Sequence, residues 1–240
     1  MKKFKYSKDR SFSTNLIYCI LSFLGLLIFG SIISLFLNTF IKNDTISGLI
    51  ANIIVIISIY LFYYKDLNNE AKIYKNKFKD NIRVSFKYYI IGFMGMIFFN
   101  LLISMFLKNI SSNEEQVREM LFNNVFITMI SISIIAPISE ELIFRKSLQP
   151  IIKNKWLYVI LSGFLFGFAH ILTNITSGTF ALTDLIYILP YGSLGASFAL
   201  MDNETKTTFS SIVIHAFHNT CTALLLLLLY KGGFVWVKKM

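Results

Sequence analysis

The chain has 240 residues, a formal net charge of +10 and a mean hydropathy of +0.62. Hydrophobic residues make up 55% of it, charged residues make up only 15%, and phenylalanine occurs 24 times. This composition excludes an ordinary soluble domain and indicates a protein that crosses a membrane several times.

Apolar segments of about 20 residues, the length that a bilayer core requires, follow one another along the chain. The predicted membrane spans are Leu16–Leu37, Ile46–Tyr64, Tyr88–Leu107, Asn123–Glu141, Trp156–Leu172, Leu182–Leu200 and Phe209–Tyr230. Uncertain boundaries leave a total of six to eight possible. No internal repeat or linker divides the chain. We therefore expect an all-α polytopic membrane protein, with residues 1–240 forming one membrane-embedded bundle of about seven transmembrane helices.

The basic residues predict the orientation of this bundle. If the N-terminus lies inside, most of the 23 Lys and Arg residues fall in inner segments, above all in the cluster Lys65–Lys87. Such a cluster is typical of a topology determinant that touches anionic lipid headgroups, so we expect the lipid bilayer, and no nucleic acid, as its partner. The abundance of Lys, Asn and Ile suggests an AT-rich bacterial genome. The predicted location is a bacterial cell membrane, with a cytoplasmic N-terminus.

Two further segments carry local structural signals. Ser111–Gln116 contains Glu114 and Glu115, and it is typical of a helix start with acids in the first turn. The small residues of Gly192-Ser193-Leu194-Gly195 favour close helix packing inside a span.

Polar residues interrupt the apolar segments in three successive motifs: Glu140-Glu141-x-x-x-Arg145, Phe166-x-x-x-His170 and His215-x-x-x-Asn219. A charged residue near the centre of a membrane helix costs about 2.5–3.5 kcal/mol on insertion scales, so these residues mark a candidate working site. An antiparallel hairpin that turns at Lys155 and Trp156 would bring Glu141 and His170 to about equal depth. His215 is early in the last span, so we expect it to lie at a shallower depth than Glu141 and His170.

Helical spacing separates the roles of the two carboxylates. Glu141 and Arg145 are four residues apart, which suits an ion pair within one helix. Glu140 is turned by about 100° from Glu141 and is the better candidate for a reactive group. A carboxylate in low-dielectric surroundings, helped by His170, could deprotonate a water that attacks a peptide carbonyl. His215 and Asn219 could then donate hydrogen bonds to the developing negative charge.

A zinc mechanism is equally compatible with these residue types. Glu140, His170 and His215 would provide the three ligands of an open hydrolytic zinc site. The sequence leaves the metal-free and the zinc mechanism open. It also leaves open whether His218 is a third catalytic group or a packing residue.

The three motifs, in this order on successive membrane helices, resemble those of the CPBP family, also called the CAAX protease and bacteriocin-processing or Abi family of intramembrane endopeptidases. The resemblance covers residues 123–230. It implies an all-helical endopeptidase that cleaves hydrophobic or membrane-associated peptides and proteins. It implies Glu140 as the water-activating base, His170, His215 and Asn219 as oxyanion stabilisers, and Glu141, Arg145 and Phe166 as catalytic or close supporting residues.

Other functions are compatible with parts of the pattern. A non-catalytic membrane scaffold, acting as a regulator or as a bacteriocin self-immunity factor, would use the polar residues only to join helices. A rhomboid-like serine protease is disfavoured because Tyr191 replaces the first glycine of the G-x-S-x-G pattern. A transporter is disfavoured because the chain shows no inverted repeat.

Overall fold

The computed structural model describes residues 5–107, 111–172 and 180–231. Within these ranges the chain forms helices and turns and no β-strand, which confirms the all-α prediction. The α-helices are α1 (Phe12–Leu24), α2 (Gly30–Ile41), α3 (Asp44–Asn76), α4 (Phe78–Phe106), α5 (Ser112–Asn123), α6 (Val125–Ile130), α7 (Ala136–Glu141), α8 (Lys155–Ala169), α10 (Ile188–Thr205) and α11 (Thr208–Lys231). Short 3-10 helices cover Ser7–Asp9 and Leu182–Tyr187, and π-helical segments cover Gly25–Phe29, Ser131–Ile135 and Leu142–Ser147.

Six helical segments of the described chain are long and apolar enough to cross a membrane. They are Phe12–Ile41, Asp44–Asn76, Phe78–Phe106, Val125–Ser147, Leu182–Thr205 and Thr208–Tyr230. The predicted span Trp156–Leu172 corresponds to α8, whose 15 residues are fewer than the roughly 20 that a bilayer core requires. The described structure therefore contains six span-length helices and one shorter apolar helix.

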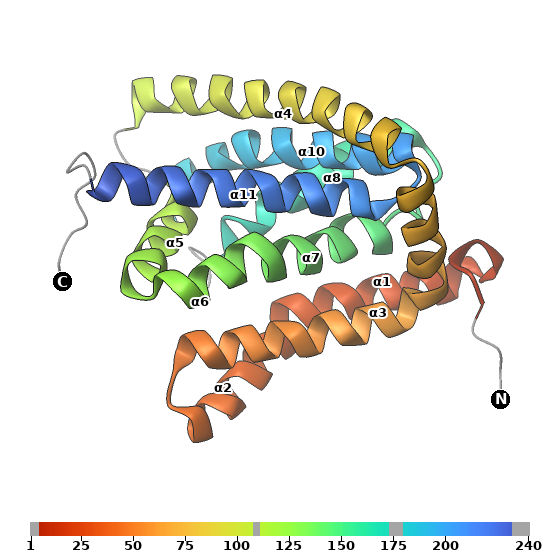
Figure 1. The fold of residues 1–240 in the computed structure, drawn as a ribbon, viewed down its shortest axis with the longest axis horizontal. Coiled ribbons are helices and arrows are strands. Elements are labelled where there is room, and N and C mark those ends of the chain that lie inside the picture. The colour runs from red at the N-terminus through yellow and green to blue at the C-terminus, as the bar shows by residue number, and fades with distance from the viewer. Residues whose placement is uncertain (1–4, 108–110, 173–179, 232–240) are drawn as a thin grey trace.

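The helices that carry the motifs occupy the middle of the bundle (Figure 1). In that view α1 and α3 lie along one side and α4 lies along the opposite side, with α7, α8, α10 and α11 between them. The helix α10 packs against both α4 and α8, and α11 contacts the helix that contains Glu140. The intramembrane polar residues are consequently shielded by protein on both sides.

Glycines bring α8 and α10 unusually close together. A Cβ atom on Gly167 would lie 2.5 Å from the carbonyl oxygen of Ile188, and one on Gly195 would lie 2.8 Å from Cβ of Phe166. Only residues without a side chain permit such an approach of two helices. The close packing predicted for the segment around Gly195 is confirmed, and it places Phe166 directly against α10.

The first motif lies on a continuous helical segment, Val125–Ser147, in which α7 is flanked by two π-helical stretches. Pro137 stands in the first turn of α7. Because α7 continues a longer helical segment, the missing N–H and the ring of Pro137 would disturb a regular helix at this point. The wider π-helical turn just before it accommodates this disturbance. The segment continues beyond the predicted end of the span at Glu141, includes Arg145 and ends before Pro150. Asn154 then caps α8, because its side chain accepts a 3.0 Å hydrogen bond from the Leu157 N–H.

The predicted helix start after the third span is confirmed. The Ser111 side chain caps α5 by accepting a hydrogen bond from the Glu114 N–H, and Glu114 and Glu115 lie in the first turn. Arg118 forms an ion pair with Glu114 one turn later. Two lysines that support the predicted orientation, Lys2 and Lys3, lie outside the described residues, as do Lys108, Lys238 and Lys239, which this orientation places on the outer side. The orientation stays a prediction.

Candidate active site

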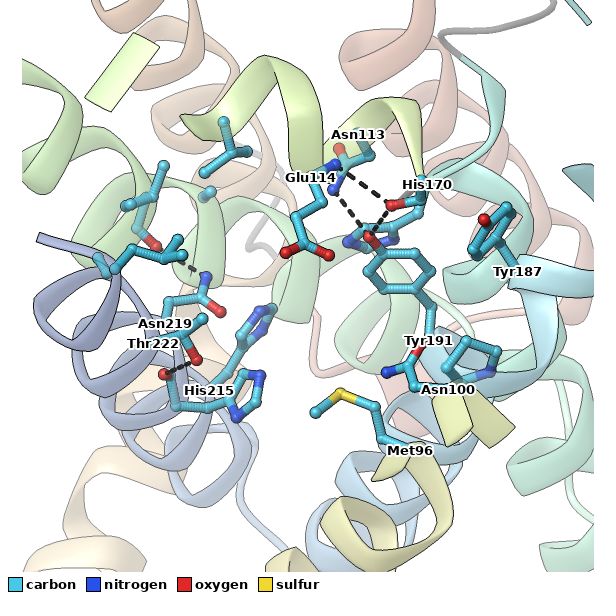
Figure 2. A pocket seen from close by; sticks show the side chains of 18 of the residues that line it. Met96, Asn100, Asn113, Glu114, His170, Tyr187, Tyr191, His215, Asn219 and Thr222 are labelled. Carbon is cyan, nitrogen blue, oxygen red and sulfur yellow. Dashed lines mark hydrogen bonds between the residues drawn. The ribbon is translucent and has the colours of Figure 1, made fainter. Parts of the chain in front are cut away.

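A cavity of about 590 Å³ opens among α4, α5, the Glu140 helix, α10 and α11 (Figure 2). This volume falls within the range of about 300–1,000 Å³ that is usual for ligand sites. Its polar lining residues are Asn100, Ser104, Ser111, Asn113, Glu114, Glu140, His170, Tyr187, Tyr191, His215, His218, Asn219 and Thr222. Its other lining residues are Met96, Ile103, Leu107, Val117, Ile132, Ala136, Pro190, Ala223 and Leu226. The cavity thus combines a hydrophobic surface with most of the predicted site residues.

The two adjacent glutamates have different surroundings. Glu140 lines the cavity, its side chain is 20% exposed, and its Oε2 has no hydrogen-bond partner among the described residues. The Glu141 side chain is fully buried and does not line the cavity. The rotation of about 100° between successive helical residues produces this separation. Glu140 is therefore the carboxylate that a bound molecule can reach.

Glu141 joins three helical segments below the cavity. Its Oε2 lies 3.1 Å from Nε of Arg145, whose side chain is also fully buried, and its Oε1 lies 2.9 Å from Nδ1 of His215. Arg145 in turn donates a 2.9 Å hydrogen bond to the carbonyl oxygen of Gly195. Buried charges must be paired in this way to be tolerated. The ion pair expected within one helix is present, and it also anchors that helix to α10 and α11.

The contact between Glu141 and His215 corrects the estimate that His215 lies shallower than the other motif residues. That estimate counted depth along α11 alone. Nδ1 of His215 lies 2.9 Å from Oε1 of Glu141, so His215 lies level with the glutamates. At the start of α11, the buried Thr208 donates a 3.0 Å hydrogen bond from its N–H to Oε2 of Glu70.

Aromatic rings surround the buried charges. The Arg145 guanidinium lies over the rings of Phe166 and Phe198, 4.8 and 5.4 Å from their centroids. The His215 ring stacks on Phe198 at a centroid distance of 4.9 Å. Such cation–π and stacking contacts stabilise a charged group that has been removed from water. This is a structural role for Phe166, the first residue of the second motif.

Hydrogen bonding fixes the tautomers of both site histidines. Nδ1 of His170 lies 2.8 Å from the carbonyl oxygen of Phe166, and Nδ1 of His215 faces the Glu141 carboxylate. Both partners are acceptors, so each Nδ1 carries the hydrogen. Each Nε2 is then a hydrogen-bond acceptor when the ring is neutral and a donor when the ring is protonated. Nε2 of His215 lies 3.8 Å from Oε2 of Glu140.

Asn219 and His218 line the same cavity from α11, and Figure 2 labels Asn219. The Asn219 side-chain amide donates a 2.8 Å hydrogen bond to the carbonyl oxygen of Ile132, which fixes its position and leaves its second N–H available. His218 has its Nδ1 3.1 Å from the hydroxyl of Tyr89, and its ring makes edge contacts with Tyr89 and Phe93. These contacts tie α11 to α4.

The possible zinc ligands do not form a metal-binding trio in this structure. Among the described residues, no three His, Cys, Asp or Glu side chains are arranged to hold one metal ion, and this includes Glu140, His170 and His215. We therefore derive no step of the reaction through a metal.

Sequence reasoning placed the site among the last four helices and missed the contributions of α4 and α5. Asn100 of α4, Asn113 of α5 and Tyr191 of α10 all line the cavity. The only sequence feature that could have indicated Asn100 is its polar side chain within an apolar span. Nothing in the sequence indicates that the start of α5 lies beside the second motif.

The cavity of this helical membrane protein thus contains a reachable carboxylate and two oriented imidazoles. Residues 122–221 match the family described as "Type II CAAX prenyl endopeptidase Rce1-like". This match supports the resemblance found in the motifs, since this part of the chain is similar to the CAAX protease family.

An uncharacterized protein of Mycoplasma capricolum subsp. capricolum is also similar to this chain. It is 27% identical over 195 residues, which cover 74% of this chain and 54% of the relative. The chain thus spans about half the length of this curated relative. No solved structure shows a significant match.

Proposed function

We propose that the chain is an intramembrane endopeptidase that hydrolyses peptide bonds in hydrophobic or membrane-associated peptides. The position of Glu140 carries this proposal. Its carboxylate faces a cavity of about 590 Å³ and has an oxygen without a partner among the described residues. His170 and His215 line the same cavity, and each has its Nδ1 occupied by a fixed acceptor. This arrangement provides a general base beside groups that can orient water and polarise a carbonyl.

The proposed reaction starts with a water between Glu140 and the scissile carbonyl. Glu140 takes one proton from this water while Nε2 of His170 accepts a hydrogen bond from the other. The hydroxide adds to the carbonyl carbon, and the resulting oxyanion accepts hydrogen bonds from the free N–H of Asn219 and from Nε2–H of protonated His215. The Glu141 carboxylate accepts the hydrogen bond from Nδ1–H of His215 and so keeps Nε2 directed toward the cavity. Glu140 then gives its proton to the leaving amine as the C–N bond breaks.

The lining of the cavity supports a hydrophobic substrate. Ile103, Leu107, Val117 and Leu226 provide an apolar surface near the polar groups. An extended peptide with aliphatic side chains would bury apolar area there, while its backbone meets the polar groups. With the N-terminus on the cytoplasmic side of a bacterial membrane, as the basic residues predict, substrates are membrane-associated peptides or protein segments.

The test compares Glu140→Gln and His170→Ala with wild type in proteoliposomes that contain a panel of fluorogenic hydrophobic peptides. Removing the base is expected to lower turnover by about 10²–10⁴-fold while membrane insertion and thermal stability stay unchanged. Glu115→Gln is the matched control, because Glu115 is an exposed glutamate on α5 outside the cavity. Treating the wild type with a chelator then separates a metal-dependent from a metal-free reaction. Full turnover by Glu140→Gln would refute the proposal.

A non-catalytic scaffold is the second candidate, as a regulator or a bacteriocin self-immunity factor. The observation that favours it is the buried network of Arg145, Glu141 and His215, which joins helices irrespective of any reaction. This alternative predicts that Glu140→Gln retains the full cellular phenotype, whereas Glu141→Ala loses it together with the fold.

A further inference from the structure

We infer that Tyr191 is a positioning residue that holds the His170 imidazole in its working orientation and links it to the start of α5. This inference rests on the proposed function and deepens it. Tyr191 belongs to none of the three motifs. It touches a predicted catalytic group, and it has no place among the reacting atoms.

The first observation is that the His170 ring contacts two aromatic rings. Tyr191 stacks on it nearly in parallel, with a centroid distance of 4.3 Å and an interplanar angle of 20°. Phe166 contacts it at 4.6 Å with an angle of 42°. The Phe166 carbonyl holds Nδ1 at 2.8 Å. One hydrogen bond leaves a ring free to tilt about that bond, whereas the ring contacts oppose the tilt.

The second observation is that the Tyr191 hydroxyl is itself held by α5. It lies 2.7 Å from Oγ of Ser111 and accepts a weaker 3.4 Å hydrogen bond from the Asn113 side-chain amide. Figure 2 shows Tyr191 beside His170, with Asn113 above them and Glu114 to their left. Ser111 is buried and also caps α5. The tyrosine ring is therefore fixed at both its aromatic face and its hydroxyl.

Together these contacts connect a wall of the cavity to the catalytic imidazole. Asn113, Glu114 and Val117 of α5 line the cavity, so a bound peptide would contact the same helix that holds the Tyr191 hydroxyl. A substrate that orders this helix would also fix His170 through Tyr191. Misplacing a catalytic group by about 1 Å can lower a rate by about 10²-fold, so such a support affects turnover strongly.

The kinetic test uses Tyr191→Phe, which keeps the ring and removes the hydroxyl, and Tyr191→Ala, which removes both. We expect kcat to fall about tenfold and about a hundredfold, respectively, with KM changed less than kcat. Tyr60→Phe is the control, because that hydroxyl binds Asn68 within α3, outside the cavity. The inference would be overturned if Tyr191→Phe and Tyr191→Ala changed kcat and thermal stability no more than Tyr60→Phe does.

A double-mutant cycle tests the link to α5. Ser111→Ala also removes the cap of α5, but this loss occurs in both the single and the double variant and cancels in the cycle. If the hydroxyl pair acts as a unit, Ser111→Ala combined with Tyr191→Phe lowers kcat no further than Ser111→Ala alone. Fully additive effects would show that α5 is not linked to His170 through Tyr191.

A third readout does not require protease activity. Diethyl pyrocarbonate modifies accessible imidazole nitrogens, and peptide mass spectrometry separates His170 from His215 and His218. In Tyr191→Ala, His170 is expected to react severalfold faster, while His215 reacts at the wild-type rate. An unchanged His170 rate in Tyr191→Ala and Tyr191→Phe contradicts the positioning role. A faster His170 rate in Tyr191→Ala, combined with no detectable proteolysis by the wild type, supports the positioning role and rejects the proposed function, so the two failures are distinguishable.

Discussion

Nδ1 of His215 lies 2.9 Å from Oε1 of Glu141, although 74 positions separate the two residues in the chain. The contact joins α11 to the Glu140 helix below the cavity. It explains why two adjacent glutamates occur in an apolar helix: Glu141 holds the site together, and Glu140 faces the space where a substrate would bind.

Replacing Glu141 by alanine is expected to destabilise the protein strongly. The change leaves Arg145 as a buried charge without its ion-pair partner, and breaking a buried pair in this way costs about 3–5 kcal/mol. Thermal unfolding in detergent measures the effect. Glu140→Gln is the matched comparison and should unfold at nearly the wild-type temperature. Equal destabilisation by both changes would show that the two glutamates do not have separate roles.

Gly195→Ala is expected to lower both stability and activity. The new Cβ would lie 2.8 Å from Cβ of Phe166, so α8 and α10 must separate, and overpacking of this kind usually costs about 1–3 kcal/mol. The same separation would move His170. Gly48→Ala provides the control, since a Cβ there meets only Oγ of Ser34 at 3.8 Å. A Gly195→Ala variant as active and stable as Gly48→Ala would contradict the packing argument.

His218→Phe should retain substantial proteolysis, whereas His215→Phe should abolish it. His218 uses its Nδ1 for Tyr89 and packs edge-on against Tyr89 and Phe93, so a phenylalanine keeps the packing and loses one hydrogen bond worth about 1 kcal/mol. Peptide cleavage in proteoliposomes, normalised to inserted protein, measures both variants. Loss of all cleavage in His218→Phe would instead make His218 a third catalytic group.

A second buried ion pair gives a prediction that concerns stability alone. Nζ of Lys146 is paired with the carboxylate of Glu70, and both residues are buried. Glu70→Ala leaves the ammonium unpaired and is expected to cost about 3–5 kcal/mol. Adding Lys146→Met to Glu70→Ala should restore much of this stability, because the uncompensated charge is then gone. Thermal unfolding of the two single variants and the double variant tests this, and a double variant no more stable than Glu70→Ala would refute it.

Several of these relationships could be predicted from the sequence because they are local. The spacing of Glu141 and Arg145 predicts their ion pair, and hydropathy predicts nearly every span. The contact of His215 with Glu141 could not be derived, because the two residues are 74 positions apart in the chain and lie on different helices. The contact of Tyr191 with His170 could not be predicted from the sequence either. No periodicity links α10 to the start of α5, and only tertiary packing brings them together.

The location of Glu70 also bears on which part of the chain can fold alone. Glu70 belongs to α3, outside the family match at residues 122–221, yet its side chain binds Lys146 and the first N–H of α11. Val55, Ile59 and Tyr63 of the same helix belong to the buried core around Phe144, Phe166 and Phe198. A fragment reduced to the motif-bearing helices would expose that core and leave the Lys146 ammonium without its carboxylate. We therefore expect that the motif-bearing region does not fold without α3 and that this N-terminal helix is an integral part of the scaffold around the cavity.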